Sequence, residues 1–433
     1  MRWQRAGRTR RSCVALESVR LGEQRRGPSL PPIVHASDRR IVITVLGVAQ
    51  ILGWGTSFYF PAVFAPPILK DTGWPLGFIV GGTSIGLLIA GLVSPQVGRL
   101  IDRHGGRPVL LASPVLFAAG LVGVGLSPSL PVYLLSWIVI GLGMGAGLYD
   151  AVFSALGRMY GSAARNPIAN LTLFGGFAST ICWPLSAFMI DHIGWRAACF
   201  AYAALHLVLS LLPQAFVLPK AEKKVEPTPA EEGAEQSNYD PRFAARIPRE
   251  GAIFALLALI LSLTAGIGAI VLVHLLIFLQ ARGVAPVAAV ALGTLFGPAQ
   301  VSARVVERLF GARYHPIWTM VASCALMAIG LTLLSVRAPL LALTILIYGA
   351  GYGVSWIGRG TLPLALFGPE RFPRLMGKLA FPSLIVQAIA PSAGALLIEA
   401  AGTDIAIAAL TALAIVNLAL IGALWALSRK PPD

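Results

Sequence analysis

The chain beyond residue 40 is a regular succession of apolar segments separated by short polar turns. Each segment is close to the roughly 20 apolar residues that a helix rising 1.5 Å per residue needs to cross a bilayer. The pattern therefore predicts twelve membrane-spanning helices in an all-α integral membrane protein. We place these spans at 41–67, 78–97, 108–126, 131–157, 168–190, 197–218, 251–281, 287–303, 316–336, 339–364, 375–398 and 405–427.

Polar segments divide the chain into two sets of six spans. Residues 219–250, rich in Pro, Glu and Lys, are typical of a solvated linker between an N-terminal half, 41–218, and a C-terminal half, 251–428. Residues 1–40 hold ten Arg and lack the apolar core of a secretory signal peptide. We expect a cytoplasmic tail that fixes orientation, with an overextended translation start, a transit peptide or an anionic-lipid anchor as alternatives. A second cytoplasmic tail is expected at 429–433.

The composition excludes a water-soluble protein, because 56% of the residues are hydrophobic and only 12% are charged, against roughly 25% charged in soluble domains. The net charge of +15 is informative only by position. With the N-terminus inside, 29 of the 34 Lys and Arg residues fall in inside segments and four in outside turns. The positive-inside rule then predicts a multi-pass protein of the bacterial cytoplasmic (inner) membrane with both termini in the cytoplasm. The expected partners are the lipid bilayer and a small solute, and not nucleic acid.

A charged loop between the second and third spans carries the clearest motif. Its residues follow the spacing Gly-x-Leu-x-Asp-Arg-x-Gly-x-Arg-x-x-Leu, on Gly98, Leu100, Asp102, Arg103, Gly105, Arg107 and Leu110. This pattern resembles the signature between the second and third helices of the major facilitator superfamily. The one departure is Gly106, where the family often has a basic residue. The resemblance implies a twelve-helix transporter whose signature loop is cytoplasmic and helps to hold the protein shut on that side.

A faint internal repeat supports two pseudo-symmetric halves. The pattern at Arg99, Asp102, Arg103 and Gly106 recurs 205 residues later at Arg304, Glu307, Arg308 and Gly311. Gly-x-Gly-x-Gly runs at 141–145 and 349–353 are 208 residues apart and favour close helix packing, with a bending point as the alternative. Transporters built from repeated halves bind their solute at the interface near the bilayer midplane. We therefore add Arg304, Glu307 and Arg308 to the candidate gate formed by the signature loop.

Two charges lie clearly within spans, Asp150 in the fourth and Arg359 in the tenth. A charge at the bilayer centre costs at least ~2.5–3.5 kcal/mol and is seldom kept without a partner or a task. In one interpretation the two side chains form a buried ion pair, or are satisfied by backbone and water, and only hold the inward side closed. In the other, Arg359 binds an anionic group of the solute while Asp150 carries or senses a proton.

Uncharged polar and aromatic side chains in the spans are weaker candidates for the solute site. Each has a structural alternative, because aromatics at helical spacing usually pack and a lone histidine in a span is usually hydrogen-bonded. This set comprises Gln50, Trp54, Tyr149, His274, Tyr352, Trp356 and Gln387.

No cofactor, metal or catalytic site is expected. The chain has no Gly-x-x-x-x-Gly-Lys-Ser/Thr loop for ATP and no nucleophile and base at interpretable spacing, so we predict that it is not an enzyme. The cysteines lack metal-ligand spacing and are expected to be buried thiols: Cys13, Cys182, Cys199 and Cys324.

These patterns predict a secondary active transporter, a symporter or antiporter that moves a small organic solute by alternating access. The phrase Thr72-Gly-Trp74, followed by the loop at 98–110, is similar to the monocarboxylate and oxalate/formate branch of the superfamily and implies an organic anion. The eighth span, as predicted, has no mid-membrane basic residue, which departs from that implication. The alternatives are a proton-coupled exporter of drug-like or metabolite solutes and a membrane sensor or receptor that transports nothing.

Overall fold

The computed structural model describes residues 36–220 and 250–428, so the C-terminal tail, most of the predicted N-terminal tail and nearly all of the predicted linker lie outside the described residues. Residues 36–40 of the predicted N-terminal tail belong to helix α2. By its internal contacts the chain divides into the units Met1–Arg40 and Ile41–Asp433, and all helices below lie in the second, apart from the first turn of α2. Over the described residues the fold is helical and contains no strand, which confirms the predicted all-α class.

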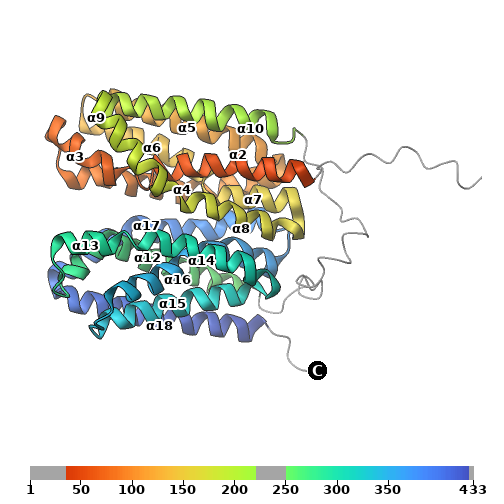
Figure 1. The fold of residues 1–433 in the computed structure, drawn as a ribbon. Coiled ribbons are helices and arrows are strands. Elements are labelled where there is room, and N and C mark those ends of the chain that lie inside the picture. The colour runs from red at the N-terminus through yellow and green to blue at the C-terminus, as the bar shows by residue number, and fades with distance from the viewer. Residues whose placement is uncertain (1–35, 221–249, 429–433) are drawn as a thin grey trace, which may run out of the picture. The chain divides into compact units, whose positions relative to one another are not determined.

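The N-terminal half consists of helices joined by short turns (Figure 1). They are α2 (Ala36–Gly55), α3 (Pro61–Thr72), α4 (Leu76–His104), α5 (Gly106–Leu126), α6 (Leu130–Gly147), α7 (Tyr149–Tyr160), the 3-10 turn η1 (Gly161–Ala164), α8 (Arg165–Gly176), α9 (Ala178–Leu205), the π-helical turn η2 (His206–Leu211) and α10 (Leu212–Val217).

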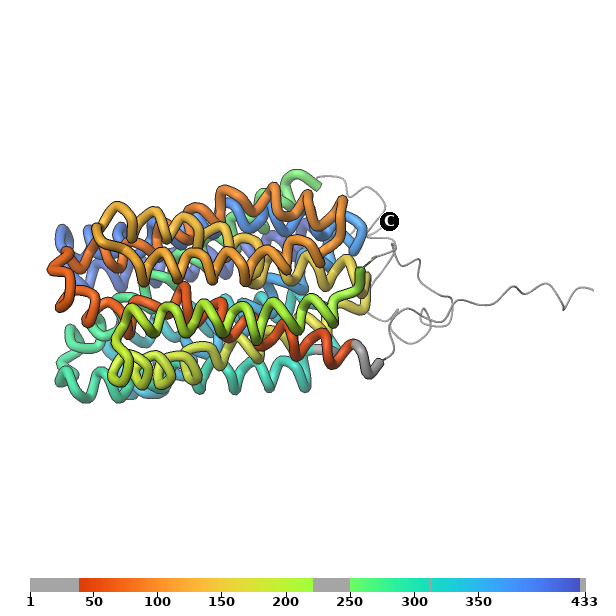
Figure 2. The backbone as a smooth tube through the Cα atoms, turned by 90° about the horizontal axis from the view of Figure 1, so that it is seen from above, coloured from red at the N-terminus to blue at the C-terminus, as the bar shows by residue number. Residues whose placement is uncertain are grey.

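The C-terminal half has fewer interruptions. It comprises α12 (Glu250–Gln280), α13 (Pro286–Gly293), α14 (Phe296–Phe310), the 3-10 turn η5 (Gly311–Arg313), α15 (Pro316–Ser335), α16 (Leu341–Phe367), α17 (Phe372–Ala401) and α18 (Thr403–Ser428). The helices of both halves run side by side along a common direction (Figures 1 and 2).

Nine helical stretches among the described residues are long and apolar enough to cross a membrane. One of them, Leu130–Val217, is 88 residues long and covers the fourth, fifth and sixth predicted spans. The first predicted span is not among these nine, because the first turns of α2 hold three charged residues, Asp38, Arg39 and Arg40. The nine stretches thus cover eleven of the predicted spans, and α2 with α3 accounts for the first.

Several spans that the sequence predicted as continuous are interrupted. The first breaks at 56–60 before Pro61 starts α3, and the fifth breaks at Phe177. The fourth breaks at Leu148, whose backbone is extended. A break exposes carbonyl groups that the helix no longer satisfies, and here side chains supply the donors. Ser113 Oγ donates to Gly143 O (2.9 Å) and Gln50 Nε2 to Gly147 O (2.6 Å).

The two halves use the same internal packing, as the repeat predicts. In the N-terminal half α4 and α5 pack on α6, and in the C-terminal half α14 and α15 pack on α16. Glycines allow these approaches, because a Cβ at Gly141 would lie 2.7 Å from Gly86 O and one at Gly353 would lie 2.6 Å from Gln300 O. Both Gly-x-Gly-x-Gly runs therefore serve close packing.

The halves meet where α17 packs on α4 and α7, and where α8 packs on α14 and α16. We call the end of the bundle that carries the turns after α4, α7, α14 and α16 the motif end. The other end, where α3 and α13 lie in Figure 1, is the opposite end.

Loops at the opposite end are tied by ion pairs within each half. In the N-terminal half Asp71 accepts from Arg196 (3.3 Å) and from Trp195 Nε1 (3.1 Å). In the C-terminal half Asp404 pairs with Arg282 and with Arg337 (2.8 Å). Arg196 and Asp404 are 208 residues apart, the shift of the repeat, so the two ties occupy equivalent loops with opposite charge.

Candidate solute site

An aromatic cluster joins the halves at mid-depth. Trp54 of α2, Tyr149 of α7 and Trp356 of α16 contact one another, with ring centroids 5.1 to 5.3 Å apart. Tyr352 extends the cluster one turn along α16, 6.1 Å from Trp356. These four candidates, predicted from three distant stretches of sequence, are all buried together at the interface.

Asp150 and Arg359 form a buried ion pair beside this cluster. Arg359 Nε donates to Asp150 Oδ1 (2.8 Å) and its NH2 donates to Oδ2 (2.9 Å), a two-pronged geometry that guanidinium and carboxylate favour. The same NH2 group also donates to Ser383 Oγ on α17 (2.7 Å). Asp150 lies in the first turn of α7, where the positive end of the helix dipole stabilises a carboxylate. The pair links the two halves.

Arg304 is a second buried guanidinium, and its placement corrects the sequence prediction. The eighth span was ended at 303, whereas α14 continues to Phe310 and holds Arg304 with only 3% of its surface exposed. The apolar run of the sequence stops at Arg304, but the helix continues, because oxygen atoms of three helices accept hydrogen bonds from the guanidinium. Arg304 donates to Gly353 O (2.9 Å), Thr172 O (2.6 Å) and Gln300 Oε1 (3.3 Å).

No carboxylate pairs with Arg304 among the described residues. Its three acceptors are neutral, so the guanidinium charge is solvated but not balanced. The Tyr149 hydroxyl shares the acceptor Thr172 O with it (3.3 Å). Arg304 therefore lies beside Tyr149 of the aromatic cluster, a position that the gate motif did not reveal.

The remaining candidates have structural partners or lie elsewhere. Gln50 accepts from Trp54 Nε1 (3.1 Å) while its amide caps the broken fourth span, so it holds the wall of the cluster. His274 Nε2 lies 3.0 Å from Pro391 O, a contact between α12 and α17. Gln387 is 1% exposed, and its amide has no hydrogen-bond partner in the described part of the chain.

The gate residues divide between contacts across the halves and contacts within one. Asp102 accepts from Arg374 Nε of the other half (2.5 Å), and its carbonyl accepts from Arg158. Arg308 reaches across to Asn170 Oδ1 (2.6 Å). Arg107, by contrast, donates to Ala215 O within the N-terminal half (2.6 Å).

Glycines of the signature loop act through their backbone. Gly98 lies so close to α17 that a Cβ there would be 2.6 Å from Pro373 O and 3.1 Å from the Cα of Gly377. Gly105 has φ +86°, which favours glycine, where α4 turns into α5. The side chain of Arg103 is exposed at the motif end. Glu307 bonds to Thr319 Oγ1 (2.9 Å) and lies 4.0 Å from Arg165 of the other half.

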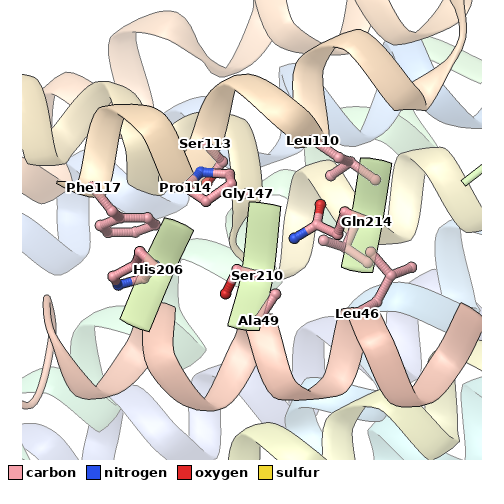
Figure 3. Close-up of a pocket in the computed structure, with 11 residues that line it drawn as sticks. Leu46, Ala49, Leu110, Ser113, Pro114, Phe117, Gly147, His206, Ser210 and Gln214 are labelled. Carbon is pink, nitrogen blue, oxygen red and sulfur yellow. The ribbon is translucent and has the colours of Figure 1, made fainter. Parts of the chain in front are cut away.

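A small polar chamber lies inside the N-terminal half (Figure 3). No residue of the aromatic cluster lines it. His206, Ser210 and Gln214 line it from η2 and α10, and His206 contacts Thr56 Oγ1 (2.8 Å). The Ser210 hydroxyl and Gln214 Oε1 have no partner among the described residues. The free volume of about 10 Å³ has room for about one water molecule. Sequence reasoning missed this chamber because three polar residues over two turns of an apolar span are common.

Candidate metal ligands do not cluster in the described residues. Cys182, Cys199 and Cys324 are buried free thiols, as predicted. Cys13 lies outside the described part.

Comparisons with known proteins place the chain among transporters. The sequence profile of the Major Facilitator Superfamily matches residues 45–315. Monocarboxylate transporter 3 of Rattus norvegicus is 27% identical over 371 residues, which are 81% of this chain and 73% of the relative.

Two solved structures illustrate the likeness of the fold. FucP of E. coli in the outward conformation superposes with a TM-score of 0.69 at 12% identity, over 91% of this chain and 100% of that one. The human organic anion transporter MFSD10 superposes with a TM-score of 0.66 at 17% identity, over 88% of this chain and 99% of that one. At these identities the superpositions show the fold alone.

Proposed function

Because this chain belongs to the major facilitator superfamily, we propose that it is a secondary active transporter that moves a small organic anion by alternating access. The resemblance in the signature loop and the twelve-helix fold are confirmed, and the relatives are transporters and not enzymes. A monocarboxylate is the favoured class of solute, because similar curated proteins are named monocarboxylate transporters.

The observation that carries the proposal is the unbalanced charge of Arg304. Burying a guanidinium costs several kcal/mol unless an opposite charge compensates it, and a protein seldom keeps such a group in a span without a task. Arg359 already has a carboxylate partner in Asp150, whereas Arg304 has only neutral acceptors. An anionic solute at Arg304 supplies the missing charge, and its planar carboxylate matches the guanidinium fork.

The aromatic cluster lies beside Arg304, because the Tyr149 hydroxyl and the guanidinium share the acceptor Thr172 O. Trp54, Tyr149 and Trp356 surround a free space of about 20 Å³ next to Asp150. That volume has room for one or two water molecules, so a solute enters only when the halves separate. A buried cation next to aromatic side chains fits a short carboxylate better than a large lipophilic compound.

The contacts between the halves support alternating access from a state that is closed at the motif end. Hydrogen bonds and ion pairs between described residues of the two halves lie at that end or at mid-depth, as in Asp102–Arg374, Ser94–Gly377 and Arg308–Asn170. The similar FucP structure is in the outward conformation.

Asp150–Arg359 is also part of this closure, because the two residues belong to different halves. Separation of the halves must break it. Protonation of Asp150 removes the charge that holds Arg359, so we include proton coupling in the proposal, with Asp150 as the group that binds the proton.

The test is flux in proteoliposomes, with labelled short carboxylates and their uncharged amides as solutes. Arg304→Gln should abolish carboxylate uptake, and Arg304→Lys should raise KM at least tenfold because an ammonium cannot form the paired hydrogen bonds. Arg337→Gln is the control, since it removes a cation whose ion pair with Asp404 lies within the C-terminal half at the opposite end. Wild-type KM in Arg304→Gln would refute the anion site.

The same preparations distinguish the alternative functions. An exporter of drug-like solutes would give an expressing strain resistance to lipophilic compounds while moving no carboxylate. A sensor would be stabilised by a carboxylate, because binding to the folded form raises the unfolding temperature, and would show no flux.

Orientation and domain boundaries complete the proposal. We assign the halves to 41–218 and 251–428 and place the motif end and both termini in the cytoplasm of a bacterium. Arg103 and His192 are exposed at the two ends. Membrane-impermeant reagents applied to intact cells should label His192→Cys and spare Arg103→Cys, and the reverse result would invert the topology.

A further inference from the structure

A groove of about 650 Å³ lies on the outside of the C-terminal half, between α14 and α15 with α16 as its floor. It forms because α14 packs on α8 and α16 while α15 packs on α16 and α18, so the two helices straddle α16. In the N-terminal half the corresponding helices α4 and α5 contact each other directly. The two halves therefore differ at equivalent positions: α4 and α5 pack directly on each other, whereas α14 and α15 leave a groove between them.

The walls of the groove are apolar and face the bilayer. Ala303, Val306 and Ala322 line it with small side chains, and Phe310 and Trp318 are 58% and 47% exposed. It follows α14 from Pro298 to Gly311, which is about 20 Å at 1.5 Å per residue. One leaflet of a bilayer is about 15 Å of hydrocarbon, half of ~30 Å.

The volume of the groove, about 650 Å³, indicates the size of the molecule that it can bind. Pockets of roughly 300–1,000 Å³ hold single ligands. The groove therefore has room for one extended hydrocarbon chain.

The motif end of the groove is positively charged. Arg313 stands between the lining residues Gly311 and Tyr314, is exposed, and has no hydrogen bond or ion pair to another described residue. Arg165 donates to the carbonyls of the same two residues, 2.7 Å in each case. The acid at this end, Glu307, is engaged by Thr319 and Arg165.

We propose that the groove binds an anionic phospholipid, with one acyl chain between α14 and α15 and the phosphate beside Arg313. The charge complementarity is that of basic side chains at a membrane surface, which attract acidic lipids. The occupied groove would brace α14, the helix that carries Arg304, from its outer face. This lipid site is separate from the solute site and does not depend on which solute is carried.

The test compares lipid binding to the purified protein by native mass spectrometry and thermal shift, with phosphatidylglycerol, phosphatidylcholine and free glycerol phosphate. Phosphatidylglycerol should bind most tightly. Arg313→Gln should weaken it about fivefold, the effect of one basic residue near an acidic surface, while Arg313→Lys should retain it. Ala322→Trp fills the groove and should abolish retention. Ala408→Trp, an equally exposed alanine on α18, is the matched control.

A second measurement does not depend on the folding of Ala322→Trp. Phosphatidylglycerol brominated on its acyl chains should quench the fluorescence of Trp318, and Trp318→Phe should remove that component. Equal retention of phosphatidylcholine would overturn the headgroup assignment. Wild-type retention in Ala322→Trp, equal stabilisation by glycerol phosphate alone, or quenching that is unchanged in Trp318→Phe would overturn the groove as the site.

Discussion

Substitution of Gly98 by alanine should shift the protein away from the state closed at the motif end. The added Cβ would lie 2.6 Å from Pro373 O, whereas ordinary contacts begin near 3.4 Å. Helix α17 would have to retreat by about 0.8 Å against a backbone atom that cannot rotate away. Such overpacking costs about 1–3 kcal/mol.

In the proposed alternating-access cycle the cost falls on one conformation only, because α4 and α17 belong to different halves and would separate when the motif end opens. A bias of 1–3 kcal/mol changes the ratio of two states about 5- to 150-fold. Spin labels at Arg103→Cys and Arg313→Cys, both exposed at the motif end, report this ratio as a distance distribution. A Cys13→Ser background suits the experiment, since the other three thiols are buried.

Gly120→Ala is the matched control. Its Cβ would lie 2.5 Å from Ile140 Cγ1 and 3.0 Å from Ile140 N, a similar clash between α5 and α6 within one half. It should lower the unfolding temperature without changing the distance distribution. An unchanged distribution in Gly98→Ala, or the same change in both variants, would refute the assignment of this contact to the closed state.

Three further results are expected from thermal unfolding in detergent. Asp150→Asn alone should lower the free energy of unfolding by about 3–5 kcal/mol, because it leaves Arg359 buried and unpaired. The double variant Asp150→Asn with Arg359→Gln should recover most of this loss. A loss below about 1 kcal/mol in Asp150→Asn would contradict the buried ion pair. Arg374→Gln should lower the free energy of unfolding by less than about 1 kcal/mol, since this side chain is 56% exposed. A loss as large as that of Asp150→Asn would show that the exposed pair with Asp102 is not weakened by solvent. Ser113→Ala should lower the free energy of unfolding by about 1 kcal/mol, because it removes the hydrogen bond to Gly143 O. Gln214→Leu removes an unpartnered amide oxygen and should leave the unfolding temperature unchanged or raise it. A larger loss of stability in Gln214→Leu than in Ser113→Ala would show that bound water satisfies the polar groups of the chamber.

The apolar runs predicted the helices well, and the errors have a common physical cause. The eighth span was ended at its first charge, yet α14 continues because carbonyls of α8 and α16 accept from Arg304. The break at Leu148 falls in an apolar stretch and is stabilised by Gln50 and Ser113, about 98 and 35 residues away in the chain. Hydropathy along the chain cannot report partners that folding brings together.

The site was partly accessible to the same reasoning. Asp150 and Arg359 stood out because a charge in a span needs a partner, and the repeat offset put them at neighbouring positions of the two halves. Ser383 did not stand out, since hydroxyls are common in spans and only the fold brings this one within 2.7 Å of Arg359. Arg304 was found as a motif residue, and its burial beside Tyr149 became visible only in the structure.

The uneven distribution of polar contacts between the halves has a kinetic consequence. Asp102–Arg374, Ser94–Gly377 and Asp150–Arg359 must all part before the motif end opens, whereas the ties at Asp71 and Asp404 each stay within one half and can persist throughout the cycle. The activation barrier of a turnover should therefore be concentrated in a single release event on one face of the membrane.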